Sequence, residues 1–168
     1  MVAGGDNATF SAFDAATDGG NNSGSTTSQT FSHTCAGSDR ILFVGVKSGT
    51  LADGDLITGA TYNGVAMSLV DKRTPGASSE SGNRWVYLFV LVAPATGANN
   101  VVVSSSSAVY IIAGAVSYSG ASQSGQPDNS VIGSTTTSTK PLTLTLTTVA
   151  DNCWVVAAMG GFESSNPP

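Results

Sequence analysis

Short runs of β-branched and aromatic residues recur along the chain, separated by clusters of Gly, Asn, Asp, Pro and Ser. This spacing predicts an all-β fold of antiparallel strands. No segment keeps a 3.6-residue apolar period over three turns, so little or no helix is expected. The expected strands are residues 8–14, 29–35, 40–47, 57–69 (with a turn inside), 84–92, 100–104, 109–119, 131–139, 142–149 and 152–159.

Three of these segments have the clearest patterns. Residues 40–47 are nearly continuously apolar, which predicts a central strand covered on both faces. Residues 84–92 predict a second buried strand whose aromatic residues share the core-facing side. In residues 57–69, the Asn-Gly pair at 63–64 predicts a tight hairpin, because a type I′ turn needs positive φ at both central positions.

Strands in this number, joined by short turns, predict an antiparallel β-sandwich of about eight to ten strands. A jelly-roll-like arrangement is preferred to an immunoglobulin-like one. Cys35 and Cys153 are too far apart for the immunoglobulin disulfide, and Trp85 is not placed as that fold requires. Both cysteines are expected as buried free thiols, with a disulfide between them as the alternative.

The N-terminal part of the chain differs in composition from the rest. Residues 15–28 form a polar, low-complexity stretch that predicts a long loop or flexible arm. The expected organisation is an N-terminal strand and flexible polar arm over residues 1–28, followed by the β-sandwich domain over residues 29–168.

Composition limits the partners of this chain. Of 168 residues only 10% are charged, against about 25% in ordinary domains, and the net charge is −5. Six Lys and Arg residues are too few for a surface that follows phosphates, so no nucleic-acid binding is expected. No apolar stretch approaches the ~20 residues that span a bilayer, so no membrane association is expected. A Ser-, Thr- and Asn-rich surface without an export signal indicates a virion or extracellular protein.

Catalytic chemistry is not expected from the residues present. The single histidine, His33, has no accompanying G-x-S-x-G nucleophile motif. Strand alternation places it on one face with Phe31 and Cys35, so a packed or hydrogen-bonded structural histidine is expected. No two of the 11 acidic residues stand out as a glycosidase pair. We therefore expect no enzyme activity, no catalytic residues and no cofactor.

Two binding sites remain as weaker candidates. Asp53 and Asp55 lie on a Gly-containing turn and could offer oxygen ligands to calcium, although turns also favour Asp for backbone reasons. Tyr62 and Tyr118 are flanked by Ser and Asn, which makes them the best candidates for exposed aromatics that stack on a sugar ring. Packing in the core or between strands is the favoured alternative for both tyrosines.

Six runs in the chain resemble a small β-sandwich module of phage virion genes and bacterial secreted proteins. They are residues 39–46 (DRILFVGV), 57–67 (ITGATYNGVAM), 84–89 (RWVYLF), 93–97 (APATG), 113–120 (AGAVSYSG) and 152–156 (NCWVV). The resemblance covers residues 30–161 and lies in structural positions, so it implies a fold and no catalytic residues. Among virion proteins it is similar to head-decoration, cement and fibre subunits.

The resemblance implies a non-enzymatic virion structural protein, a capsid decoration, cement or fibre-type subunit. Its partners would be capsid or other virion proteins and further copies of itself, most simply as a trimer. The first alternative is a carbohydrate-binding β-sandwich module of a surface or secreted protein. The second is a self-polymerising extracellular fibre subunit that uses an open C-terminal edge.

Overall fold

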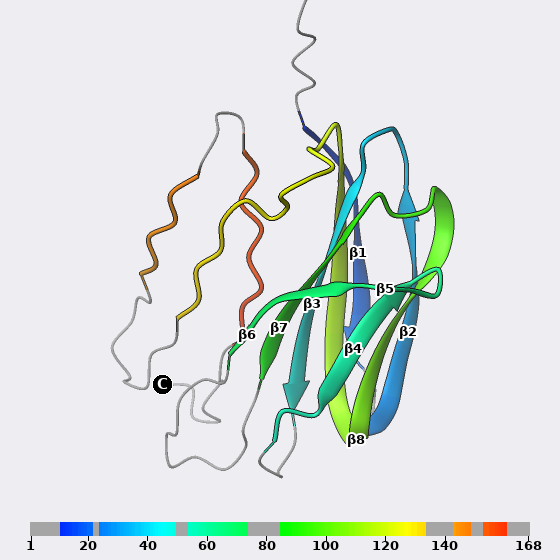
Figure 1. Cartoon of the computed structure of the whole chain (residues 1–168). Coiled ribbons are helices and arrows are strands. Elements are labelled where there is room, and N and C mark those ends of the chain that lie inside the picture. The colour runs from blue at the N-terminus through cyan, green and yellow to red at the C-terminus, as the bar shows by residue number, and fades with distance from the viewer. Residues whose placement is uncertain are drawn as a thin grey trace, which may run out of the picture.

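The computed structural model describes residues 11–21, 24–49, 54–73, 85–133, 143–148 and 153–160. These residues form eight β-strands and no helix (Figure 1). The strands are β1 (Ala12–Asn21), β2 (Thr26–Cys35), β3 (Ile41–Gly49), β4 (Ile57–Tyr62), β5 (Val65–Ala66), β6 (Ser68–Arg73), β7 (Val86–Val92) and β8 (Gly97–Ser119). All pairings between them are antiparallel, which confirms the expected all-β antiparallel class.

The long strand β8 organises the sheet. Its first half pairs with β2 and β4, and its second half pairs with β1 and β3. The main path of the sheet runs in the order β5-β4-β8-β3-β7-β6. Because β8 belongs to both halves, the sheet curls into a nearly closed barrel (Figure 1). This corrects the clear two-sheet sandwich that the sequence predicts.

The sequence predicts separate strands at 100–104 and 109–119, where the structure has the single strand β8. This prediction is wrong because the serine-rich stretch between them remains extended, while the partner strands shift register there. Ser105 Oγ and the backbone N–H of Ser106 both donate to the carbonyl of Leu56, each at 2.9 Å. Polar contacts therefore bend the strand without ending it.

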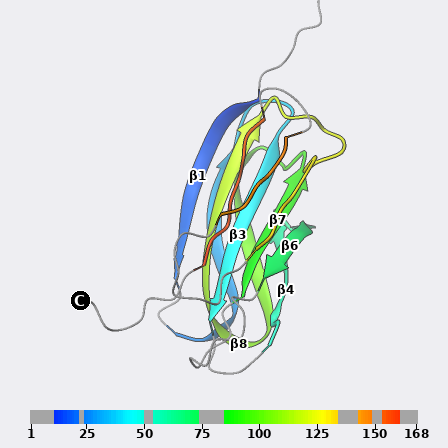
Figure 2. The same ribbon diagram turned by 90° about the vertical axis from the view of Figure 1, so that its left-hand side faces the viewer.

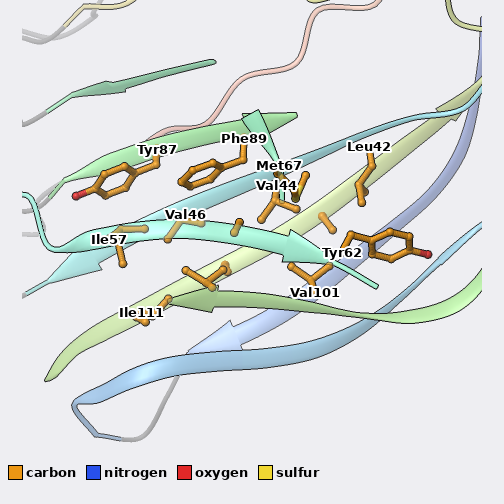
Figure 3. Close-up of a cluster of buried hydrophobic side chains, with 14 of the residues drawn as sticks. Leu42, Val44, Val46, Ile57, Tyr62, Met67, Tyr87, Phe89, Val101 and Ile111 are labelled. Atoms are coloured by element: carbon orange, nitrogen blue, oxygen red, sulfur yellow. The ribbon is translucent and has the colours of Figure 1, made fainter. Parts of the chain in front are cut away.

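The barrel interior contains the side chains of alternate strand positions (Figure 3). In β3, Leu42, Val44 and Val46 point inward and are at most 2% exposed. The rings of Tyr87 and Phe89 on β7 stack with centroids 6.2 Å apart, which confirms that the aromatic residues of this strand face the core. The buried interior cluster is Cys35, Leu42, Val44, Val46, Ile57, Ala60, Tyr62, Met67, Tyr87, Phe89, Val101, Val103, Val109, Ile111, Ala113 and Ala115.

Two local predictions are also confirmed. Strand β3 lies between β7 and β8, and its other face carries the buried side chains of Ile41 and Phe43. Both faces of this apolar strand are thus covered. Asn63 and Gly64 have φ values of 49° and 76° and connect β4 to β5, as a turn with two positive φ angles requires.

The polar segment at 15–28 is not one long loop. Residues 15–21 belong to β1 and residues 26–28 belong to β2, so strand β2 crosses the expected boundary at residue 28. Pairing with β8 explains this, because the ladder supplies backbone hydrogen bonds that need no apolar side chains. At Gly19 a Cβ would lie 2.6 Å from the Phe31 ring and 2.7 Å from the Ala113 carbonyl oxygen, so the small residue permits close packing.

Strands are also predicted at 131–139, 142–149 and 152–159. The described residues of these segments, 131–133, 143–148 and 153–159, are not assigned to strands, so the prediction is wrong for them. Their alternating pattern reflects a different arrangement, in which they lie outside the barrel as a further layer (Figure 2).

Candidate functional site

A chain of polar side chains bridges β1 and β2, which each pair with β8 but form no ladder with one another. Thr17 Oγ1 lies 2.8 Å from His33 Nδ1, and His33 Nε2 lies 3.0 Å from Ser117 Oγ. Ser117 Oγ donates to Asp14 Oδ2 at 2.7 Å. Gln29 Nε2 adds donations to the carbonyls of residues 19 and 20 at 2.8 and 3.0 Å. Side chains therefore close this side of the barrel.

The hydrogen bonds place a proton on Nε2 of His33. Since Ser117 gives its proton to Asp14, it accepts from His33 Nε2–H. The Thr17 hydroxyl can donate to Nδ1 of the neutral imidazole. Burial lowers the pKa of His33, and the Asp14 carboxylate offsets that effect only in part.

This cluster does not have the geometry of an activated nucleophile. In such a relay the histidine lies between the acid and the hydroxyl, whereas here Ser117 lies between Asp14 and His33. His33 is 1% exposed and Ser117 is 0% exposed, so neither side chain is accessible to a substrate. His33 is packed and hydrogen-bonded, as the sequence predicts.

The calcium candidates are not brought together by the described structure. Asp53 lies outside the described residues, and both carboxylate oxygens of Asp55 already have partners. Tyr87 donates to Oδ1 at 2.8 Å, and Lys72 forms an ion pair with Oδ2. Burial opposes ionisation of Asp55, but the bonds from Lys72 and Tyr87 outweigh it and lower the pKa of this carboxyl. Among the described residues, no three His, Cys, Asp or Glu side chains gather where they could hold a metal ion.

Tyr62 and Tyr118 are both buried, which agrees with the packing that the sequence favours and rules out the weaker alternative of exposed aromatics. Tyr62 is 0% exposed in the interior, and its hydroxyl donates to the carbonyl of Gly97 at 2.9 Å. Tyr118 is 7% exposed and packs edge-on against Phe13, with centroids 6.2 Å apart. Their polar sequence neighbours lie on the opposite side of each strand, so these neighbours do not make the rings accessible. Neither ring can stack on a sugar in this arrangement.

The two cysteines are free thiols in different environments. Cys35 is buried, which agrees with the expectation for this residue, and burial raises its pKa. Cys153 is exposed rather than buried, and its thiol lies 3.8 Å from Asp128 Oδ2. The two residues form no disulfide with one another.

A second apolar cluster lies on the outside of the barrel, and we call it the outer apolar face. It comprises Ile41 and Phe43 of β3, Leu88, Val90 and Val92 of β7, Val116 and Tyr118 of β8, and Val70 of β6. Four of these side chains are buried although they point away from the interior. A layer outside the sheet must therefore cover them.

Part of that cover is the segment formed by residues 153–160 (Figure 2). Trp154 packs on the Tyr118 ring with centroids 5.0 Å apart, and its Nε1 donates to the Ser11 carbonyl at 2.9 Å. Val156 packs against the outer apolar face. Further along, the Ala158 methyl group lies 3.4 Å from where a Cβ on Gly45 would be. Alternate residues of the segment thus contact the sheet.

The neighbouring segments 128–133 and 143–148 extend this layer (Figure 1). Asn129 Nδ2 donates to the Thr147 carbonyl at 2.8 Å, and the Cys153 thiol contacts Asp128. These segments leave large apolar side chains exposed, and we call the three segments together the C-terminal layer. The exposed apolar residues of this layer are Val131, Ile132, Leu144, Trp154, Val155 and Met159.

Sequence reasoning missed the outer apolar face as a candidate surface. The signal was present in the doubly covered strand at 40–47 and in the apolar alternation at 152–159. The sequence does not show that these two segments meet, because contacts between the C-terminal layer and the sheet join residues far apart in the chain. A polar pocket of about 420 Å³ lies elsewhere, lined by Thr61, Asn63, Gly64, Ala98, Asn99, Asn100 and Val102.

No protein-family model, no curated protein and no solved structure matches this chain. In the described part of the chain, no helix has the length and apolar character needed to cross a membrane.

Proposed function

We propose that this protein is a non-enzymatic structural subunit that stabilises an assembly through protein–protein contacts, as capsid decoration, cement or fibre-type subunits of virions do. The observation that supports this proposal is the exposed apolar surface of the C-terminal layer. Val155 is 62% exposed and Met159 is 88% exposed, beside the half-exposed ring of Trp154. Large exposed apolar side chains that gather in one layer favour an interaction site.

Composition supports the same proposal. Ser and Thr side chains take the place of charged ones on the surface, and they lose little conformational entropy when a partner covers them. A homo-oligomer with closed symmetry, such as a trimer, would pool many small contacts of this kind. The jelly-roll-like resemblance and a virion or extracellular location belong to this proposal.

The test is the oligomeric state of the full chain, measured by light scattering after size-exclusion chromatography over a wide concentration range. We expect a discrete oligomer that dissociates in the double variant Val155→Ser/Met159→Ser. Val65→Ser is the matched control, because Val65 is 53% exposed on the β4–β5 hairpin, away from the layer. A protein that stays monomeric at every concentration and does not co-sediment with purified phage heads would contradict the proposal.

Carbohydrate binding is the second candidate, and the polar pocket beside the β4–β5 turn favours it. Three asparagines and one threonine line this pocket and offer amide and hydroxyl groups to sugar hydroxyls. A glycan array probed with the full chain, with and without calcium, tests this function. Binding that is lost in Asn99→Ala/Asn100→Ala would support it, and an array without hits would remove it.

A further inference from the structure

Two glycines lie opposite one another on the outer side of the sheet. Gly45 of β3 pairs with Gly114 of β8, and both alternate with residues whose side chains point into the interior. Glycine weakens the interior of a strand and often marks a place where another group approaches the backbone closely. For Gly45 that group is Ala158, whose methyl carbon lies 3.4 Å from an added Cβ. The C-terminal layer thus accounts for this glycine.

Gly114 has no such cover. Among the described residues, only the Thr17 carbonyl oxygen lies within 4 Å of an added Cβ, at 3.3 Å, and no side chain does. Gly114 lines a cavity of about 380 Å³ between strands β1, β3, β7 and β8 and residues 156–159. We call this cavity the glycine pocket. A group from outside the chain can therefore approach the backbone at Gly114.

The walls of the glycine pocket are mainly apolar. Ile112 and Val116 lie two residues before and after Gly114 on β8, and Ala158 and Met159 line the pocket from the C-terminal layer. Ile112 is 43% exposed and Met159 is 88% exposed. These two side chains leave apolar surface at the pocket that a partner could cover.

A carboxylate lies beside Gly114 on the neighbouring strand. Asp18 of β1 pairs with Gly114 and lines the pocket. Its Oδ1 accepts a hydrogen bond from the backbone N–H of Gly20 at 2.8 Å, and no donor of the described residues contacts Oδ2. Lys47 also lines the pocket, but it belongs to the next pair along the sheet, with Ile112. Asp18 is therefore the charged group nearest to Gly114, and one of its oxygens is available to a ligand.

We propose that the glycine pocket binds a lysine or arginine side chain of a partner protein, with the apolar stem over Gly114 and the cationic end on Asp18. This inference rests on the proposed assembly function and names the kind of partner surface that the subunit would contact. A long basic side chain combines an apolar stem with a charged end, which are the two parts that this pocket accommodates. The net charge of −5 also favours a basic partner.

The test is the binding of fluorescently labelled pentapeptides to the full chain, measured by anisotropy at low salt. The first peptide is capped Ala-Val-Lys-Val-Ala, and norleucine or Glu replaces Lys in the other two. Norleucine keeps most of the apolar stem without the charge. We expect the Lys peptide to bind about fivefold more tightly than the norleucine peptide, as for a partly exposed ion pair, and the Glu peptide to bind most weakly.

Two variants of Asp18 test the origin of this preference. Asp18→Asn keeps an acceptor for Gly20 and should make the Lys and norleucine peptides bind equally. Asp18→Lys should reverse the preference, so that the Glu peptide binds most tightly. Asp71→Lys is the matched control, because it makes the same change of charge on β6, at the other side of the sheet. This control should keep the preference for Lys.

Filling the pocket tests the place of the stem. Gly114→Val should weaken the binding of all three peptides, because its side chain would occupy the pocket. Gly59→Val is the matched control, since no described atom lies within 4 Å of its added Cβ. The Asp18 variants change an exposed side chain and decide the proposal if Gly114→Val does not fold.

Equal binding of the Lys and norleucine peptides to the parent protein would overturn the proposal. A preference for Lys that survives in Asp18→Lys would overturn it as well. If light scattering finds an oligomer but no peptide binds, the pocket proposal fails and the assembly function stands. If the peptides bind with the expected preference but the protein never assembles, the pocket proposal is supported and the assembly function is contradicted.

Discussion

The inner and outer faces of β3 are both apolar, but they are covered in different ways. Leu42 and Val44 point into an interior enclosed by hydrogen-bonded strands, whereas Phe43 on the opposite face is covered by the C-terminal layer. The inner cover is part of the sheet, and the outer cover rests on it. Burial alone therefore does not distinguish the two covers, whereas the backbone hydrogen bonds of the described strands do.

The largest expected effect comes from truncating the inner face. Leu42→Ala should lower the free energy of unfolding by about 3 kcal/mol, because it leaves a cavity among packed neighbours. Leu88→Ala on the outer apolar face is the matched control and should cost about 1 kcal/mol, since this side is only partly enclosed. Urea titration of both variants measures the difference. Equal losses of stability in the two variants would mean that the outer cover encloses Leu88 as completely as the interior encloses Leu42.

Adding a methyl group where β1 packs against β2 should lower the free energy of unfolding almost as strongly. Gly19→Ala should cost about 2 kcal/mol, because its Cβ would overlap the Phe31 ring and a backbone carbonyl oxygen. Gly59→Ala, with open space around the new methyl group, should be neutral or stabilising by about 0.5 kcal/mol. Thermal unfolding of the pair measures this contrast. A Gly19→Ala variant as stable as the parent would contradict the close packing of β1 on β2.

The hydrogen-bonded polar side chains between β1 and β2 should make stability depend on pH. Since burial lowers the pKa of His33 below 6.5, the unfolded chain binds the proton more readily than the folded one. Stability is thus fully present above about pH 6.5 and falls as the pH drops below it. Urea midpoints from pH 7.5 to 5 measure the slope. His33→Gln can keep both hydrogen bonds but cannot titrate, so it should lose the part of the pH dependence that comes from His33. An unchanged slope in that variant would show that His33 is not its source.

Much of the barrel could be predicted from the sequence, because its strongest signals are local. The apolar run in β3, the aromatic strand β7 and the turn at 63–64 depend on near neighbours, and all three are confirmed. The strands β1 and β2 were not recognised in the polar segment at 15–28, because their pairing depends on the distant strand β8.

The candidate surface could be predicted less well than the fold. The alternation at 152–159 predicts a strand, although the alternate residues contact the face of a sheet instead of a ladder partner. The same two-residue period describes both arrangements, and only tertiary contacts separate them. For Tyr62 and Tyr118 the sequence favours packing over exposure, and the structure agrees, because polar neighbours in the sequence do not reveal which face of the strand is buried.

The most direct test of the contrast between the two covers is native-state hydrogen exchange, read by mass spectrometry on peptides from residues 41–49 and 153–160. We predict slow exchange for the first peptide, because β3 is paired on both sides, and fast exchange for the second under conditions where the barrel stays folded. Equal, slow exchange in both peptides would contradict the account, because the outer cover would then be part of the same cooperative unit as the sheet.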